Sequence, residues 1–152
     1  MKKLIVLSGI PGSGKSTWTK QFVDNAEDGT VKVVSADINR LAIGGSKDNF
    51  EHETDVWKKV YDDILMYSFN DEVQVVIADN TSISNKSRLQ YVKFKDLYEL
   101  ELLLFRVPAE ECIRRNAQRE KPVPEDAMKR MINYWQEPSE EVKNIFTIKE
   151  LN

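Results

Sequence analysis

A glycine-rich segment near the N-terminus constrains the fold of this chain more than any other feature. Residues Gly9-Ile10-Pro11-Gly12-Ser13-Gly14-Lys15-Ser16-Thr17 match the pattern G-x-x-x-x-G-K-[ST] at every fixed position. They follow the apolar run Leu4-Ile5-Val6-Leu7, so the order strand, phosphate-binding loop (P-loop), helix is predicted. The glycines let consecutive backbone N–H groups turn inward around an anion, and the helix N-terminus adds its positive dipole end.

The same pattern predicts which groups hold a nucleoside triphosphate. Lys15 is expected to reach the β- and γ-phosphates, and the Ser16 hydroxyl is expected to face Mg²⁺. The predicted cofactors are therefore ATP and Mg²⁺. The residues expected to bind the nucleotide are Gly12, Ser13, Gly14, Lys15, Ser16 and Thr17.

Composition narrows the class of protein. The 152 residues suffice for one domain with a core, and 41% hydrophobic with 31% charged residues is typical of a soluble globular chain. The single Cys112 excludes an internal disulfide and favours a reducing, cytoplasmic compartment. No apolar run reaches the ~20 residues of a membrane span, so no membrane partner is expected. The net charge of −3 means that any contact with nucleic acid must be local.

Apolar β-rich runs alternate with amphipathic helical patterns, which is typical of an α/β protein with a parallel sheet covered on both faces. We expect one domain over residues 1–152 with four to five strands, whose carboxyl ends share the edge where ligands bind. The expected strands are Lys3–Leu7, Val31–Ser35, Val73–Ala78, Leu100–Val107 and Ile145–Ile148.

Asp37 follows the second expected strand closely. A carboxylate there would face the γ-phosphate from the side opposite the P-loop and could accept the proton of an attacking hydroxyl. Arg40 lies three residues on, so on a helix it would share the face of Asp37 and could neutralise phosphate charge near the acceptor. A purely structural role of Asp37 as the N-cap of that helix is an equally good interpretation.

Asp79 follows the third expected strand, in the manner of a Walker B segment. A carboxylate at this position can hold Mg²⁺ directly or through water. The alternative is that Asp79 only starts a turn after the strand. Asn80 and Thr81 could bind acceptor groups, or they could satisfy the backbone of the loop.

Arg115 and Arg119 are four residues apart, so on one helix they would project from the same face. The loop Glu120–Pro124 follows them, and Pro124 starts another helical pattern. This arrangement suits a lid over about residues 112–126, with two guanidinium groups closing over the triphosphate. The alternative is that both arginines belong to a solvated helix face. Arg114 would point elsewhere.

Together these features resemble the kinase domain of phage-type 5′-hydroxyl polynucleotide kinase, within the wider group of small, AAA-like P-loop kinases whose acceptors vary. The resemblance covers most of residues 1–136. Beyond the P-loop it depends on Asp37-x-x-Arg40, Asp79, the pair Arg115 and Arg119, and Val123-Pro124-x-x-Ala127-Met128. It implies a P-loop kinase fold with a C-terminal helical lid, acting in a cytoplasm that would be the host's for a phage protein.

The resemblance also implies roles for single residues. Lys15 and Ser16 would bind the triphosphate and the metal, and Asp79 would be a second metal ligand. Asp37 would be the general base for a 5′-hydroxyl, and Arg40 would contact the phosphate of the acceptor. Two lid residues would complete the catalytic set, with Arg119 stabilising the γ-phosphoryl group and Arg115 beside it.

Two departures from the phage pattern bear on function. The chain stops where such an enzyme would continue into a phosphatase domain, so only the phosphorylating half is expected. Asn80 and Thr81 stand in the opposite order to the phage form, which leaves the acceptor contact open.

Three functions therefore remain. The leading hypothesis is an ATP-dependent kinase of the 5′-hydroxyl end of DNA or RNA. The second is a kinase of a small-molecule hydroxyl, such as a nucleoside, nucleotide, sugar or antibiotic, which the acidic net charge favours. The third is a nucleotide-binding module without transfer activity, against which Asp37 and the lid arginines argue.

Overall fold

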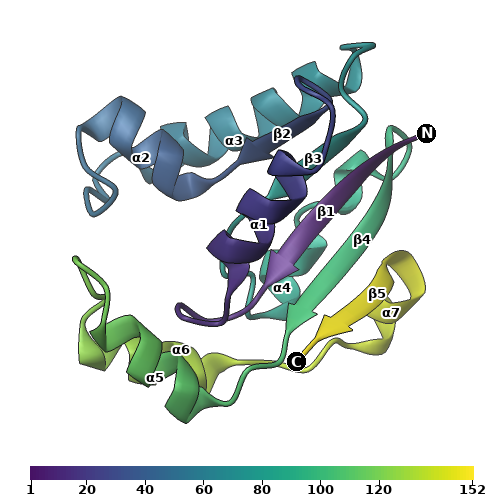
Figure 1. Ribbon diagram of the computed structural model, residues 1–152. Helices are drawn as coiled ribbons and strands as arrows, with labels where there is room; N and C mark the ends of the chain where they lie inside the picture. Colours follow the sequence, from purple (N-terminus) through teal and green to yellow (C-terminus); the bar gives the residue numbers. More distant parts are fainter.

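The computed structural model describes residues 1–152 and contains one parallel sheet of five strands in the order β2-β3-β1-β4-β5 (Figure 1). This confirms the predicted α/β architecture. The strands are β1 (Lys2–Ser8), β2 (Val31–Val34), β3 (Val75–Ala78), β4 (Tyr98–Phe105) and β5 (Thr147–Leu151). The helices are α1 (Lys15–Asp24), α2 (Ala36–Gly44), α3 (Glu53–Ser68), α4 (Asn85–Leu89), α5 (Ala109–Ala117), α6 (Glu125–Tyr134) and α7 (Glu140–Ile145), with a 3₁₀ turn at Val92–Phe94.

The central strand β1 is buried on both faces, as its unbroken apolar sequence predicts. Leu4 and Val6 face the larger core, where α3 supplies Val60 and Ile64. The alternate residues of β1 face a smaller cluster on the other side of the sheet, against which α1 packs Trp18 and Phe22. Helices thus cover both faces, and the register of β1 between β3 and β4 is fixed by apolar side chains on each side.

The expected and observed strand boundaries differ most at the C-terminus. The first four strands agree with the prediction to within two residues at either end. The fifth was expected at Ile145–Ile148 but begins at Thr147, because Ser139 caps α7 and the helix continues through Ile145. Between β3 and β4 the chain forms only the short α4 and the 3₁₀ turn at Val92–Phe94.

The topology brings distant segments together at one edge of the sheet. All strands are parallel, so the chain leaves β1, β2, β3 and β4 at the same edge. Beyond this edge the α2–α3 pair projects on one side and the α5–α6 pair on the other, with the P-loop (residues 9–17) between them (Figure 1). None of the helices has both the length and the apolar character needed to cross a membrane.

Candidate functional site

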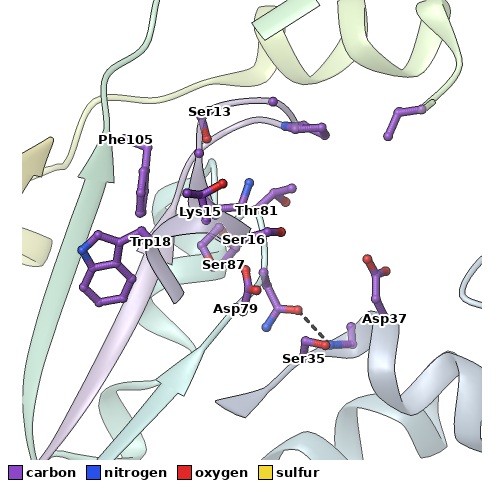
Figure 2. Close-up of a pocket in the computed structure, with 18 of the residues that line it drawn as sticks. Ser13, Lys15, Ser16, Trp18, Ser35, Asp37, Asp79, Thr81, Ser87 and Phe105 are labelled. Carbon is purple, nitrogen blue, oxygen red and sulfur yellow. Dashed lines mark hydrogen bonds between the residues drawn. The ribbon is translucent and has the colours of Figure 1, made fainter. Parts of the chain in front are cut away.

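An open cavity of about 1300 Å³ lies at this edge of the sheet. Its walls come from the P-loop, α2, the segment after β3, and the α5–α6 pair (Figure 2). The structure therefore brings together every residue that the sequence suggested for the site, although their roles stay predictions. These residues are Gly12, Ser13, Gly14, Lys15, Ser16, Thr17, Asp37, Arg40, Asp79, Arg115 and Arg119.

The P-loop presents an uncompensated helix N-terminus to the cavity. Gly12 and Gly14 have φ angles of 86° and 99°, a left-handed conformation that glycine adopts readily. Gly14 is the N-cap of α1, so no side chain caps the helix, and its first turn contains no acidic residue. The Ser13 hydroxyl is buried beside this N-terminus without a hydrogen-bond partner. Free donors and a positive dipole end in one loop form an anion site.

Lys15 lies folded onto its own loop. Its Nζ donates to the carbonyls of Gly9 at 2.6 Å and Ile10 at 3.1 Å. Burial lowers the pKa of Lys15 from its usual value to about 8, and the nearby Asp79 carboxylate opposes this shift only in part. A buried amine without a direct anionic partner fits a triphosphate, because bound phosphate would supply the missing negative charge.

The donors suited to Mg²⁺ are the Ser16 hydroxyl and the Asp79 carboxylate. Burial raises the pKa of Asp79, and the Lys15 ammonium lowers it by a smaller amount. The structure contains no cluster of three or more His, Cys, Asp or Glu side chains that could hold a metal alone. Mg²⁺ in nucleotide sites is typically bound by one or two carboxylates together with phosphates and water. Asp79 and Ser16 fit this mode of binding.

Asp37 faces the P-loop from the opposite wall of the cavity (Figure 2). The N-cap of α2 is Ser35, whose Oγ accepts from the Ile38 N–H at 3.0 Å, so the interpretation of Asp37 as the cap is wrong. The Asp37 side chain is 68% exposed, and its Oδ1 accepts from Arg40 Nη1 at 2.9 Å. Because Ser35 satisfies the helix end, the Asp37 carboxylate is available to a substrate.

Asn80 has a structural partner that the sequence left open. Its Oδ1 accepts from the Ala36 N–H at 2.9 Å, and its Nδ2 donates to the Tyr91 hydroxyl at 3.0 Å. The first of these bonds is the dashed line in Figure 2. The side chain of Asn80 therefore connects the segment after β3 to the start of α2. In this way it fixes the position of Asp37 relative to the sheet.

Arg40 forms an ion pair with Glu53, a residue that no sequence motif indicated. Glu53 accepts from Arg40 Nε at 2.7 Å and Nη2 at 2.9 Å, and this pair lowers the pKa of the Glu53 carboxyl. The guanidinium also lies 4.5 Å from the centre of the Phe50 ring, and the Arg40 side chain is only 13% exposed. No local pattern could have revealed this pair, because Glu53 belongs to another helix. Contact between Arg40 and an acceptor phosphate stays a prediction.

The α5–α6 pair lies at the wall of the cavity where a lid was predicted. Arg115 lies on α5, but α5 ends at Ala117, so Arg119 lies in the following loop and not on the same helix as the spacing predicted; both residues line the cavity. Asn116 and Val123 exchange two hydrogen bonds, of 2.9 and 3.0 Å, which close the loop that carries Arg119. Arg115 donates to Glu111 at 2.9 Å and to the Gly12 carbonyl at 3.4 Å, whereas Arg119 has no carboxylate partner. Arg114 pairs with Glu111 and does not line the cavity.

The fold and the cavity define a P-loop nucleotide-binding protein with a kinase-like architecture. The donors at the N-terminus of α1 and the buried Lys15, in a cavity that Arg115 and Arg119 also line, support binding of ATP. Residues 4–138 match the AAA_33 family of AAA domains, and the chain belongs to this family.

Curated relatives and a solved structure extend this similarity. The chain is 32% identical over 103 residues to 2′,3′-cyclic-nucleotide 3′-phosphodiesterase of Pongo abelii, a match that covers 68% of this chain and 23% of the relative. It is 26% identical over 145 residues to L-seryl-tRNA(Sec) kinase of Methanococcus maripaludis, covering 89% and 53%. A chain of the Pnkp1/Rnl/Hen1 RNA repair complex superposes with a TM-score of 0.74 at 25% identity, covering 97% and 47%. This chain thus spans between 23% and 53% of the length of these proteins.

Replacement of Gly12 by alanine is expected to damage nucleotide binding. A Cβ at this position would lie 2.4 Å from the Cys112 carbonyl oxygen of α5, so the P-loop or the lid must move. We expect the affinity for ATP, measured by calorimetry, to fall at least tenfold in Gly12→Ala.

Gly45→Ala is the matched control, because Gly45 has a similar φ of 80° but no atom within 4 Å of its Cβ position. It should lose about 1 kcal/mol of stability from backbone strain and keep its affinity for ATP. Equal affinities for ATP in Gly12→Ala and Gly45→Ala would contradict the view that the close approach of Gly12 to Cys112 of α5 matters for nucleotide binding.

The lowered pKa of Lys15 predicts that ATP binding weakens at alkaline pH. Above about pH 8 the free protein loses the ammonium charge, and phosphate binding must restore it by taking up a proton. We expect the dissociation constant to rise by about tenfold for each pH unit above 8, with proton uptake seen by calorimetry in two buffers. Lys15→Arg stays charged and should show no such rise. A dissociation constant independent of pH from 7 to 9.5 in the wild type would refute this assignment.

Proposed function

We propose that this chain is an ATP-dependent phosphotransferase that moves the γ-phosphoryl group of ATP to the 5′-hydroxyl end of DNA or RNA. One observation carries the proposal. Asp37, freed from capping by Ser35, faces the P-loop across a cavity that the lid arginines also line. A protein that only bound nucleotide would have no need of an exposed carboxylate at this point.

The proposed reaction needs positioning and charge neutralisation more than covalent chemistry by the protein. Lys15 exchanges the Gly9 and Ile10 carbonyls for phosphate oxygens, and the α1 N-terminus holds the phosphates. Asp37 accepts the proton of the acceptor hydroxyl as the oxygen bonds to phosphorus and the bond to the β-phosphate oxygen breaks. Arg119, with no carboxylate partner, stabilises the charge that develops on the transferred group. Bound Mg²⁺ would supply further neutralisation of the phosphates.

The open shape and the lining of the cavity support a nucleic-acid acceptor. The cavity of about 1300 Å³ is open to solvent, so the end of a strand can enter it beside bound ATP. Lys47 and Lys86 line it as well, and neither forms an ion pair with a carboxylate. They supply local positive charge on a chain with a net charge of −3. The name of the tRNA kinase relative and the RNA repair complex favour the same class of acceptor. We also propose that the enzyme is of the phage type, on the residues that carry this resemblance in the sequence.

A panel of acceptors tests the substrate class. We expect radiolabel from γ-labelled ATP to appear on 5′-hydroxyl oligonucleotides and not on the same oligonucleotides with a 5′-phosphate. Transfer restricted to nucleosides, nucleotides, sugars or antibiotics would replace the proposal with the small-molecule kinase that the acidic net charge favours. Absence of transfer to every acceptor, with ATP still bound, would leave a nucleotide-binding module.

Asp37→Ala tests the proposed base. Removal of the carboxylate should lower kcat by about 10²–10⁴-fold, because the acceptor hydroxyl loses its proton acceptor. The affinity for ATP should stay within about threefold, since the N-cap bond of Ser35 remains. Asp48→Ala, which removes an exposed carboxylate outside the cavity, is the matched control. Substantial residual turnover in Asp37→Ala would exclude Asp37 as the base.

A further inference from the structure

Arg88 is a buried cation that has no part in the proposed transfer of phosphate. It lies on α4 with a relative exposure of 0%, and no carboxylate forms an ion pair with it. Burial lowers its pKa to about 10. A charge buried without an ionic partner is costly, so a well-packed apolar side chain would serve stability better. Its presence calls for a reason other than core packing.

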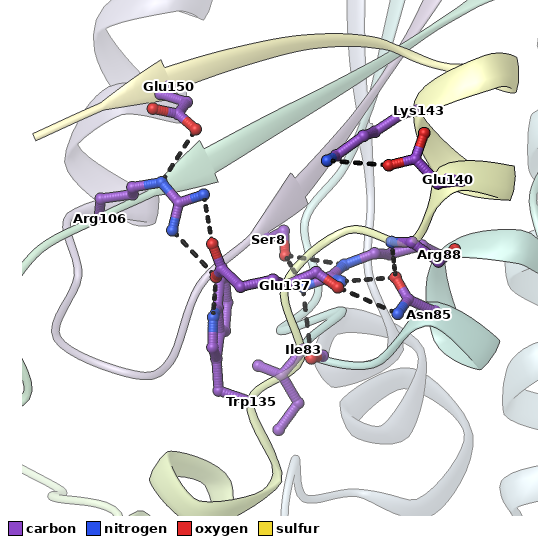
Figure 3. Close-up of polar contacts among 11 residues, drawn as sticks. Ser8, Ile83, Asn85, Arg88, Arg106, Trp135, Glu137, Glu140, Lys143 and Glu150 are labelled. Carbon is purple, nitrogen blue, oxygen red and sulfur yellow. Dashed lines mark hydrogen bonds and ion pairs between the residues drawn. The ribbon is translucent and has the colours of Figure 1, made fainter.

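The guanidinium of Arg88 connects segments that are far apart in the sequence (Figure 3). It donates to the Ser8 Oγ at 3.1 and 3.3 Å, at the end of β1 where the P-loop begins. It also donates to the Ser82 carbonyl at 3.0 Å and the Ile83 carbonyl at 3.3 Å, in the segment that follows Asp79. The base of the P-loop and the segment after β3 are therefore held by one side chain.

The segment after β3 is strained where Arg88 holds it. Ser82 has a φ of 43° and is the one non-glycine residue with a positive φ. This conformation costs an ordinary residue free energy, and it persists only where surrounding contacts fix it. The Ser82 carbonyl also accepts from Ser8 Oγ at 2.7 Å, and the Gly9 N–H donates to the Thr81 carbonyl at 2.9 Å. Arg88 thus completes a set of bonds that fixes Thr81 beside the P-loop.

Further contacts connect Arg88 with the segment that follows α6 and, through Glu137, with the segment that precedes α5. The Arg88 guanidinium lies 5.1 Å from the centre of the Trp135 ring, just after α6. Arg88 also donates to Asn85 Oδ1 at 2.9 Å, and Asn85 contacts the chain that leaves the lid, donating to the Glu137 carbonyl at 3.1 Å. Arg106, just before α5, forms an ion pair with the Glu137 carboxylate at 2.8 Å (Figure 3).

We propose that Arg88 is a positioning residue that holds the Asp79 segment and both ends of the lid in a fixed relation to the P-loop. Its effect on catalysis rests on the proposed function, whereas its effect on these segments does not. A guanidinium fork can donate to Ser8, Ser82, Ile83 and Asn85 at once. A lysine ammonium keeps the charge but cannot span Ser8, Ser82 and Asn85 together.

The first test compares Arg88→Lys with the wild type in nucleotide binding and transfer to a 5′-hydroxyl oligonucleotide. We expect kcat to fall at least tenfold while the affinity for ATP stays within threefold, because ground-state phosphate contacts remain. Arg130→Gln is the matched control, since Arg130 is exposed on α6 and pairs only with Asp126. A role in stability alone would lower the melting temperature and leave kcat per folded molecule unchanged.

The second test does not need activity. Hydrogen exchange in Arg88→Lys should be at least tenfold faster in peptides covering residues 79–87 and 135–139, and unchanged in β4. Ser8→Ala, which removes one shared partner, keeps the proposal testable if Arg88→Lys does not fold. It should accelerate exchange in the 79–87 peptide alone, and the two changes combined should be less than additive.

The outcomes separate the two proposals. Wild-type protein that transfers phosphate to no acceptor refutes the proposed function, and the exchange data then decide on Arg88. Folded variants with wild-type kcat and wild-type exchange in both segments refute the positioning role while leaving the proposed function intact.

Discussion

The whole site depends on one electrostatic feature, an uncompensated positive helix end beside a buried amine. Gly14 is the N-cap of α1 and offers no capping side chain. The Lys15 ammonium donates hydrogen bonds only to neutral carbonyls of its own loop. Both groups gain most from a bound polyanion. The other polar groups of the cavity are arranged around the position that such an anion would take.

Parallel topology turns this anion site into a candidate for transfer chemistry. The strands leave the sheet at one edge, so Asp37 after β2 and Asp79 after β3 reach the same cavity as the P-loop. Contacts with backbone groups of α2 and α5 then fix the walls. Asn80 ties the segment after β3 to the start of α2, and the close approach of Gly12 to Cys112 places the lid against the loop. Arg88 adds bonds from α4 to Ser8 at the end of β1 and to the carbonyls of Ser82 and Ile83 after β3.

Local patterns predicted the P-loop, the first four strands and some of the residues that line the cavity, among them Asp37, Asp79 and Arg115. Periodicity and strand ends could be recognised because they depend on neighbouring residues. The pairing of Arg40 with Glu53 and the burial of Arg88 could not be predicted in this way. Each depends on how separate helices pack, which one sequence does not reveal. The capping by Ser35 was missed because Asp37, two residues on, is an equally common cap residue.

A structure with a non-hydrolysable ATP analogue and a 5′-hydroxyl oligonucleotide tests the central claim most directly. We expect Lys15 to leave the Gly9 carbonyl for the phosphates, and an Asp37 oxygen to lie about 2.6–3.2 Å from the terminal 5′-oxygen. A complex in which Lys15 binds the phosphates while the 5′-oxygen contacts another residue, with Asp37 still on Arg40 alone, would contradict it.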